Sequence, residues 1–196
     1  MIPDFNASGV LPPYVGETPG GSSADMSPYD VSLLQVVQRF ATTQVRRKIL
    51  RGLLDYREAL RNIGLTDGFQ WLDGSFVEDI ESSALARAPN DIDIVTFFRR
   101  PDQAKSPADW SAFVRLNTNL FQDRNAVKEQ YSCDAFLVDL DIRPDLIVDH
   151  TRYWLGLFSH QRTSGMWKGM VRVSLDGGDA QALDLLNEMG EDDEEA

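Results

Sequence analysis

The chain has 196 residues, of which 42% are hydrophobic, and this is enough to pack the core of one domain. It contains no run of about 18 apolar residues and no signal-peptide pattern, so the sequence predicts a cytoplasmic protein without membrane insertion. The single cysteine, Cys133, excludes an internal disulfide and a zinc site built on several cysteines.

The net charge of −12 is unevenly distributed along the chain. Nine acidic residues and no Lys or Arg lie from Asp176 onward, whereas 22 acidic residues face 19 Lys and Arg in the rest. The acidity therefore belongs mainly to the C-terminal segment and does not exclude a polyanionic substrate at the core. Five of the nine prolines lie before residue 29. We predict an extended N-terminal segment (1–28), a folded domain (29–175) and an acidic tail (176–196).

Two helices are predicted ahead of the first strand, over residues 29–40 and from Thr42 or Thr43 to about Ile63. Their expected buried stripes are Leu33, Leu34, Val37 and Phe40 in the first and Val45, Ile49, Leu53, Tyr56 and Leu60 in the second. Seven cations lie on these helices, namely Arg39, Arg46, Arg47, Lys48, Arg51, Arg57 and Arg61. They indicate either a surface for triphosphate or nucleic acid, or a solvated face that also attracts the acidic tail.

The remaining elements alternate between strands and helices. Apolar runs predict strands at 69–72, 91–98, 132–140 and 166–175, and helical periodicity predicts helices at 106–121, 125–130, 144–158 and 180–189. This order indicates an α/β fold with a small mixed sheet flanked by helices.

The clearest chemical signal is an Asp-x-Asp pattern at the start of an apolar strand. Asp91 and Asp93 alternate with Ile92 and Ile94, so both carboxylates project from the same face. Adjacent carboxylates repel each other and resist burial. A divalent cation removes that cost, and oxygen ligands of this kind suit Mg²⁺ or Mn²⁺. The alternatives are a turn or cap role for Asp91 and an arginine partner for Asp93.

A glycine-serine turn follows the preceding strand. Gly74 would let the backbone approach a ligand closely, and Ser75 offers a hydroxyl and an amide to a phosphate. A Gly-Ser pair is common and means little alone. Its position ahead of an Asp-x-Asp strand gives it weight.

These two pieces in this order resemble the nucleotidyltransferase-fold superfamily related to DNA polymerase beta. Within it, the chain looks most like small stand-alone bacterial proteins, including a group long known only as a domain of unknown function. The shared stretches are Gly68–Phe76 (GFQWLDGSF), Arg87 and Pro89–Val95 (PNDIDIV), and the resemblance covers roughly Leu11 to Leu175. It implies a minimal nucleotidyltransferase fold. The insert between Ser75 and Asp91, with Glu78, Asp79 and Glu81, is longer than in most relatives. It either forms part of the substrate rim or displaces the usual geometry of the site.

The resemblance also implies a reaction and a set of site residues. Nucleoside monophosphate would pass from an NTP, such as ATP, or a dNTP to a hydroxyl acceptor at a two-metal Mg²⁺ or Mn²⁺ site. Asp91, Asp93 and a third carboxylate would hold the metals. Asp134 matches the third position best and could also accept the hydroxyl proton, with Asp139 and Asp141 as the fallback. Phosphate contacts would come from Gly74, Ser75, Arg87 and Lys168, with His160 and Arg162 nearby. For Lys168, His160 and Arg162, a role in a surface loop is equally compatible with the sequence.

The biological role stays open between several expectations. One is synthesis of a nucleotide signal or oligonucleotide in bacterial antiphage defence, beside an effector protein. Another is an antitoxin that modifies or masks a partner toxin, and a third is an inactive nucleotide-binding module. Self-priming would use Ser174, or else Ser164 or Thr163, as acceptor, because no hydroxyl-bearing residue follows Ser174. A homodimer is also compatible with the sequence.

Overall fold

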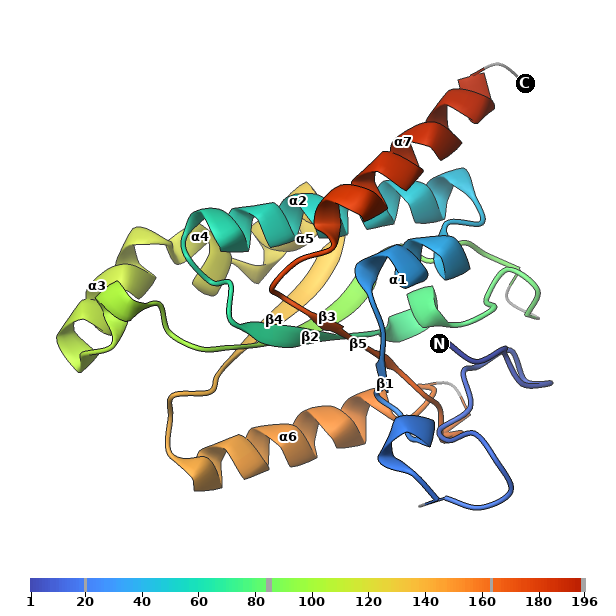
Figure 1. The fold of residues 1–196 in the computed structure, drawn as a ribbon, viewed down its shortest axis with the longest axis horizontal. Helices are drawn as coiled ribbons and strands as arrows, with labels where there is room; N and C mark the ends of the chain where they lie inside the picture. The colour runs from blue at the N-terminus through green and yellow to red at the C-terminus, as the bar shows by residue number, and fades with distance from the viewer. Residues whose placement is uncertain (20, 84–85, 163, 195–196) are drawn as a thin grey trace.

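The computed structural model describes residues 1–19, 21–83, 86–162 and 164–194, with side chains as far as residue 190 (Figure 1). In this part of the chain, one mixed sheet has the strand order β1-β5-β2-β3-β4. The strands are β1 (Tyr29–Asp30), β2 (Gly68–Asp73), β3 (Ile92–Phe98), β4 (Cys133–Asp139) and β5 (Val171–Ser174). β3 runs parallel to β4 and β1 parallel to β5, whereas β2 is antiparallel to both its neighbours. The predicted α/β class with a small mixed sheet is confirmed.

Helices cover both faces of the sheet unequally (Figure 1). The α-helices are α1 (Leu33–Phe40), α2 (Gln44–Asn62), α3 (Pro107–Leu116), α4 (Thr118–Phe121), α5 (Arg124–Tyr131), α6 (Pro144–Phe158) and α7 (Asp179–Glu194). α1, α2, α5 and α7 lie over one face, and α6 lies alone over the other. α3 and α4 extend from one end of the sheet. Short 3-10 turns lie at Ser23–Asp25, Gly74–Val77 and Asp102–Ala104.

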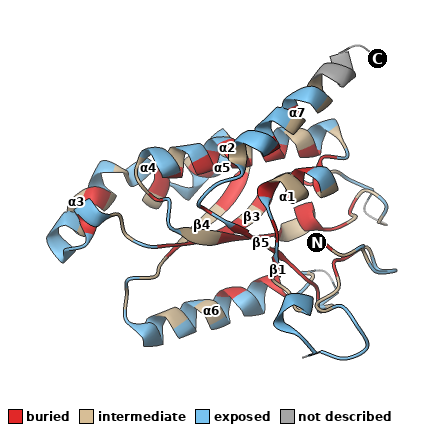
Figure 2. Ribbon diagram, viewed as in Figure 1, coloured by how far each residue is buried: buried red, intermediate tan, exposed pale blue. Residues whose placement is uncertain are grey.

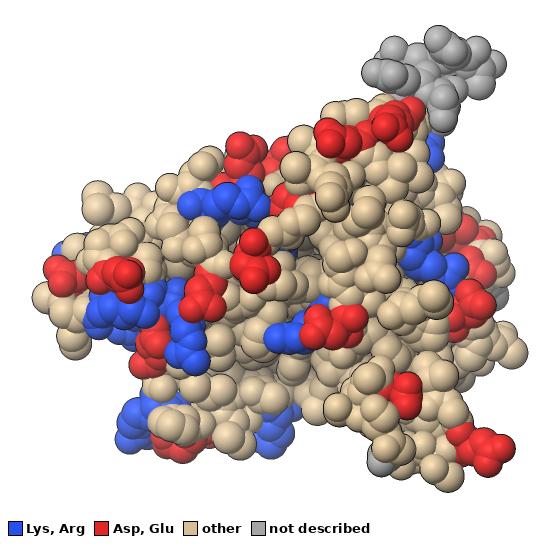
Figure 3. All heavy atoms as spheres, in the orientation of Figure 1, with Lys and Arg blue, Asp and Glu red and all other residues tan. Residues whose placement is uncertain are grey.

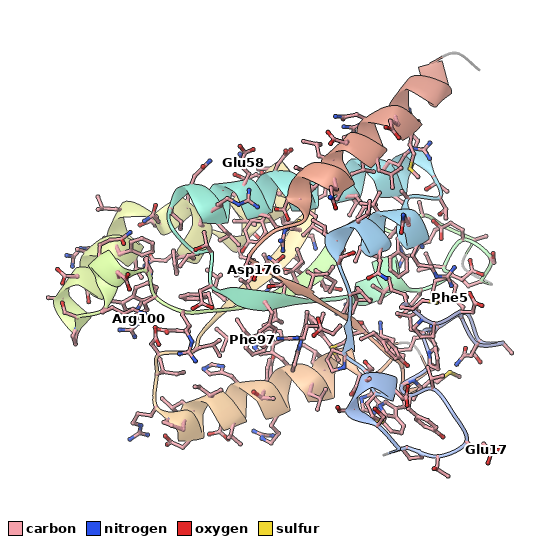
Figure 4. The ribbon with its side chains drawn as sticks, in the orientation of Figure 1. Phe5, Glu17, Glu58, Phe97, Arg100 and Asp176 are labelled. Carbon is pink, nitrogen blue, oxygen red and sulfur yellow. The ribbon has the colours of Figure 1, made fainter. Side chains whose placement is uncertain are left out.

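Alternation along the strands divides the core into two clusters. Ile94 and Phe98 of β3 pack with the α1, α2 and α7 side, whereas Val95 and Phe97 pack with Trp154 of α6. Phe97 is labelled in Figure 4 between the sheet and α6. The strands are largely buried, while the outer sides of the helices are exposed (Figure 2). The candidate site lies at the edge of the sheet face that α6 covers.

α1 and α2 form because each begins at a side-chain cap. Ser32 makes a capping box with Gln35, and the Thr43 side chain accepts from the Arg46 amide. Two details of the predicted stripes are wrong: Val36 rather than Leu34 is buried in α1, and Val45 is exposed while its neighbour Arg46 is buried.

Two of the seven basic residues of α1 and α2, which were expected on a surface, are buried. Arg46 and Arg57 are only 3% and 2% exposed. Arg57 donates to Gln70 Oε1, to the carbonyl of Ser174 and to Asp179 of α7. Arg51 donates to the Leu186 carbonyl, so attraction between these helices and the C-terminal segment is confirmed. Figure 3 shows Lys and Arg interspersed with Asp and Glu over the face in view.

The two ends of the folded region differ from the prediction. Tyr29–Asp30 pairs with β5 as a short edge strand, because the chain becomes helical only after the Ser32 cap. β5 covers only Val171–Ser174, since Gly169 and Lys168 donate instead to the carbonyls of Leu11 and Ser159. The helix predicted at 180–189 is confirmed as α7, which packs on α1 and α2 and runs further, to Glu194.

The proline-rich N-terminal segment is anchored to the domain. Val10 and Leu11 are fully buried, and Val10 forms an isolated bridge with Glu78 of the insert. Phe5 packs against Phe40 at the end of α1 (Figure 4). Within the described residues, no helix combines the length and apolar character needed to cross a membrane.

Candidate functional site

Three aspartates meet at one end of the sheet. Asp73 ends β2, Asp93 lies at the start of β3 and Asp134 at the start of β4. The pairing register places Asp73 opposite Asp93 and Asp93 opposite Asp134. Their side chains share the face of Trp71, Val95 and Val138, which pack with α6. Asp91, one residue ahead of β3, adds a further carboxylate at this end.

A cavity of about 960 Å³ opens at these strand ends. Its walls come from the N-terminal segment, the turn after β2, the insert, α5 and α6. The cavity brings together all the residues predicted to bind metal or nucleotide: Gly74, Ser75, Arg87, Asp91, Asp93, Asp134 and Lys168. Below, Asp91, Asp93 and Asp134 are called the carboxylate trio.

The glycine-serine turn packs directly against the trio. Gly74 has φ +79°, a left-handed conformation that disfavours side chains. A Cβ added at Gly74 would lie 2.2 Å from Asp93 Oδ2. Glycine is therefore required twice here, by the backbone conformation and by the close approach of the Asp93 carboxylate.

Lys168 lies beneath this turn, 2% exposed, and is already paired. Its Nζ is 3.0 Å from Asp73 Oδ1, 2.8 Å from Glu78 Oε1 and 3.2 Å from the Gly74 carbonyl. Burial raises the pKa of Asp73 to about 7, and Lys168 opposes the shift. In this geometry Lys168 braces the turn, and its predicted phosphate contact stays a prediction.

Two cations of α5 pair with Asp91 and Asp134, and sequence reasoning missed both. Lys128 forms an ion pair with Asp91 and lies 3.6 Å from Asp134 Oδ2. Arg124 Nη2 donates to Asp134 Oδ2 at 2.7 Å. Burial by itself raises the pKa of Asp134, but the hydrogen bonds from Arg124 outweigh it and hold the pKa below its usual value. The sequence feature that could have identified them is a pair of cations four residues apart on the helix just before β4, the strand of Asp134.

Asp93 is the exception within the trio. Among the described residues, no cation forms an ion pair with it. Burial and the charges of Asp91 and Asp134 raise its pKa. A half-buried carboxylate between two others suits a divalent cation, so the donor chemistry fits Mg²⁺ or Mn²⁺. Among the described residues, however, no three or more His, Cys, Asp or Glu side chains are arranged as a preformed metal site. This agrees with the pairing of Asp91 and Asp134 with the α5 cations.

The fallback acids lie elsewhere. Asp139 pairs with Arg100, and Asp141 pairs with Arg99 and Lys105, at the far end of β4. The register thus brings Asp134, and neither of these two, beside Asp93.

The other predicted residues are spread around the cavity or lie outside it. Arg87 is exposed at the rim, where it donates to the Ala88 carbonyl. Ser174 pairs with Phe69, four residues along β2 from Asp73, which is roughly 13 Å. It is exposed and donates to Asp176. Ser164 is exposed and donates to Gln161, and Thr163 lies outside the described residues.

The acidic insert residues have separate partners. Glu78 is bound by Lys168 and by Gln161. Glu81 binds the buried Arg46 through two hydrogen bonds, of 2.6 and 2.8 Å. Asp79 lines the cavity, and its amide donates to the Gly9 carbonyl. The insert therefore forms part of the rim of the cavity, which is the first of the two alternatives from the sequence.

An aromatic wall leads away from the trio along α6. Arg124 lies over the Phe136 ring at 4.2 Å, and Phe136 contacts Trp154 with ring centroids 4.3 Å apart. Trp154 contacts Tyr153 edge to face at 4.9 Å. Tyr153 is 55% exposed and lines the cavity. Phe136, Trp154 and Tyr153, called the aromatic wall below, are three contacting rings, tilted or perpendicular to one another, next to the acidic site.

Comparison with known proteins identifies a family without naming an activity. No curated protein and no solved structure matches the chain. A family model does match, over residues 3–174, which includes most of the N-terminal segment and all the cavity elements. The chain therefore belongs to the family described as a family of unknown function, DUF6932.

Proposed function

We propose that this protein is a metal-dependent nucleotidyltransferase. The observation that carries the proposal is the alignment of Asp93 and Asp134 on adjacent parallel strands, with the Gly74–Ser75 turn packed against Asp93. Carboxylates at a strand end supply oxygen ligands for Mg²⁺ or Mn²⁺, and a glycine turn beside them supplies backbone to a phosphate. This combination in one cavity favours phosphoryl chemistry over a purely structural acidic cluster.

The reaction requires a hydroxyl oxygen to attack the α-phosphorus of a nucleoside triphosphate. A new phosphorus–oxygen bond forms, the bond to the β-phosphate bridge breaks, and pyrophosphate leaves. Bound divalent cations would stabilise the charge on the attacking and leaving oxygens. Asp91, Asp93 and Asp134 would hold them, and Asp134 is the candidate acceptor of the hydroxyl proton. Gly74 and Ser75 would orient the phosphate chain, with Arg87 at the rim.

The aromatic wall supports a nucleotide rather than a simple phosphate as substrate. Its exposed member, Tyr153, lines the same cavity as the trio. A nucleobase that stacks on such a ring gains about 1–3 kcal/mol. We therefore place the base along α6 and the phosphates toward the turn after β2.

A second candidate function is nucleotide binding without transfer. It is favoured by the ion pairs that Lys128 and Arg124 form with Asp91 and Asp134, because these already neutralise part of the trio. A binding module with such pairs would retain the cavity but would not need a metal.

The deciding experiment incubates the protein with each labelled NTP and dNTP in Mg²⁺ or Mn²⁺. Products are separated by size and by attachment to protein. We expect a free oligonucleotide, a cyclic nucleotide or a protein adduct, and its loss in the double variant Asp91→Asn/Asp93→Asn. Asp141→Asn is the control, since it removes an ion-paired carboxylate at the far end of β4, outside the cavity. Nucleotide binding without product, unaffected by Asp91→Asn/Asp93→Asn, would favour the binding module.

A further inference from the structure

The α5 cations occupy the carboxylate oxygens that a divalent cation needs. Lys128 binds Asp91 and lies 3.6 Å from Asp134, and Arg124 binds Asp134 at 2.7 Å. A carboxylate oxygen that accepts from an ammonium or a guanidinium has fewer lone pairs and less negative charge left for a metal. The two cations therefore compete with a metal for Asp91 and Asp134.

Both cations have room to leave the carboxylates. The Lys128 and Arg124 side chains are 45% and 53% exposed. Lys128 and Asp91 also line a second cavity of about 320 Å³ on the α5 side. Arg124 has a second support, because its guanidinium lies over the Phe136 ring. When Asp134 turns to another ligand, Arg124 can stay at the cavity wall.

Displacement by a metal alone leaves these charges without counterions. Two cations would then face each other and the metal across one part-enclosed cavity, which is electrostatically unfavourable. A polyphosphate chain that arrives with the metal restores the balance, because its oxygens can accept from Lys128 and Arg124. The same two residues thus oppose a free divalent cation and favour a metal–polyphosphate complex.

We propose that Lys128 and Arg124 couple metal binding to polyphosphate binding. They suppress capture of a free divalent cation by the carboxylate trio and retain a divalent cation that brings a polyphosphate chain. This inference rests on the proposed nucleotidyl transfer and deepens it, because it names the metal–polyphosphate complex as the unit that the site selects. It gives α5 a role in ligand selection, in addition to the roles proposed for the Asp-x-Asp and Gly-Ser stretches.

The test measures two affinities in the full-length protein and in Lys128→Gln. Free Mn²⁺ binding is followed by electron paramagnetic resonance, and binding of inorganic tripolyphosphate in the presence of Mn²⁺ by calorimetry. We expect Lys128→Gln to bind free Mn²⁺ about threefold to fivefold more tightly, the size of one part-exposed ion pair. We expect it to bind tripolyphosphate with Mn²⁺ more weakly by a similar factor.

Two variants serve as controls. Lys105→Gln removes a lysine of similar exposure that pairs with Asp141 outside the cavity, and both affinities should stay at the wild-type value. Lys128→Arg keeps the charge and should restore wild-type behaviour if Lys128→Gln acts through charge rather than through folding.

The outcomes separate this inference from the function on which it rests. Opposite shifts of the two affinities in Lys128→Gln support the coupling. Unchanged or weaker free Mn²⁺ binding in Lys128→Gln overturns it, and the metal site itself still stands if Asp93→Asn abolishes Mn²⁺ binding. Absence of Mn²⁺ binding in every variant, with or without tripolyphosphate, overturns both the coupling and the proposed function.

Discussion

At the scale of single residues, Gly74 determines whether Asp93 can keep its place. A methyl group at this position would lie 2.2 Å from Asp93 Oδ2, well inside van der Waals contact. The carboxylate must then move, and so must any ligand that it holds. This gives the turn a role in positioning an acid in addition to its predicted approach to phosphate.

We predict that Gly74→Ala lowers Mn²⁺ affinity by about tenfold or more and destabilises the fold by about 2–4 kcal/mol, through backbone strain and overlap. Mn²⁺ titration and urea unfolding measure the two effects. The matched control is Gly178→Ala, which has a similar φ of +82° but no atom within 4 Å of the added Cβ. It should cost about 1 kcal/mol and leave Mn²⁺ affinity unchanged. Equal Mn²⁺ affinity in a folded Gly74→Ala protein would contradict the placement of Asp93 as a ligand.

The buried guanidinium of Arg46 links α2 to the insert through Glu81. Arg46 also donates to the carbonyls of Phe76 and Glu78, so it fixes the chain just after the Gly-Ser turn. The hydrogen bond from Arg46 holds the pKa of Glu81 below its ordinary value of 4.5. A carboxyl whose pKa is lower in the folded state stabilises the fold above its unfolded pKa, and this contribution is lost as pH falls through the folded pKa.

We therefore predict that Glu81→Gln lowers the free energy of unfolding by about 1–3 kcal/mol at pH 7, since it weakens a charge-assisted pair to a buried guanidinium. The difference from wild type should shrink as pH falls below about 4.5, where the carboxyl of Glu81 in the unfolded chain takes up a proton first, and it is lost as pH falls through the lower pKa of the folded state. Urea unfolding from pH 7 to pH 3 measures it. Asp145→Asn, which breaks the exposed pair with Arg143, should cost under about 0.5 kcal/mol throughout. A difference that stays constant from pH 7 to pH 3 would argue against this ion pair as its source.

At the scale of elements, α6 is the helix that covers the site's face of the sheet. Its buried residues, Trp154 and Phe158, pack on Phe97 and Val138, while Tyr153 and Leu157 face the cavity. The helix therefore has two functions at once, to close one half of the core and to present the aromatic wall. A substitution on the cavity side can test the second without removing the first.

We predict that Tyr153→Ala weakens ATP binding by about 1–2 kcal/mol, or fivefold to thirtyfold, because it removes the exposed stacking surface. Binding of tripolyphosphate, which has no base, should not change. Calorimetry with both ligands in Mn²⁺ measures the difference. Tyr153→Phe should retain ATP affinity, and Leu155→Ala, which alters another exposed α6 residue that does not line the cavity, should affect neither ligand. A parallel loss of both ligands would instead indicate a disturbed α6.

Elements with a local signal could be predicted from the sequence, and those that depend on distant partners could not. α2, β2, β3 and β4 follow from periodicity. Asp91, Asp93 and the Gly-Ser turn follow from two short stretches, whereas Asp134 was assigned through the resemblance. Arg46 was misplaced because a charged residue is buried only where Glu81 and two carbonyls happen to receive it. β1 needs β5, more than a hundred residues later, and so has no local signal. The α5 cations were missed because their partners, Asp91 and Asp134, lie on other elements of the fold.

At the scale of the whole molecule, α7 completes the core on the face away from the site. Asp179, at its first turn, binds Arg57, which in turn binds Gln70 of β2. Gln70 donates to Thr96 of β3, so a buried polar chain runs from α7 into the sheet. Ala182 and Leu186 are fully buried. The C-terminal segment is therefore tied to the strands that carry the site, although it lies on their opposite face.

We predict that Leu186→Ala lowers the free energy of unfolding by about 2–4 kcal/mol, because a fully buried leucine leaves a cavity when it is shortened. Leu183→Ala is the matched control on the same helix. Its side chain is 41% exposed, so the loss should stay below about 1 kcal/mol. Urea unfolding measures both. A small, equal effect of the two changes would mean that α7 is detached from α1 and α2 in solution. Arg51 and Arg61 would then be available to other anions. A large effect of Leu186→Ala alone would mean that those cations stay engaged with α7, and the cavity at the strand ends would remain the proposed place for polyphosphate.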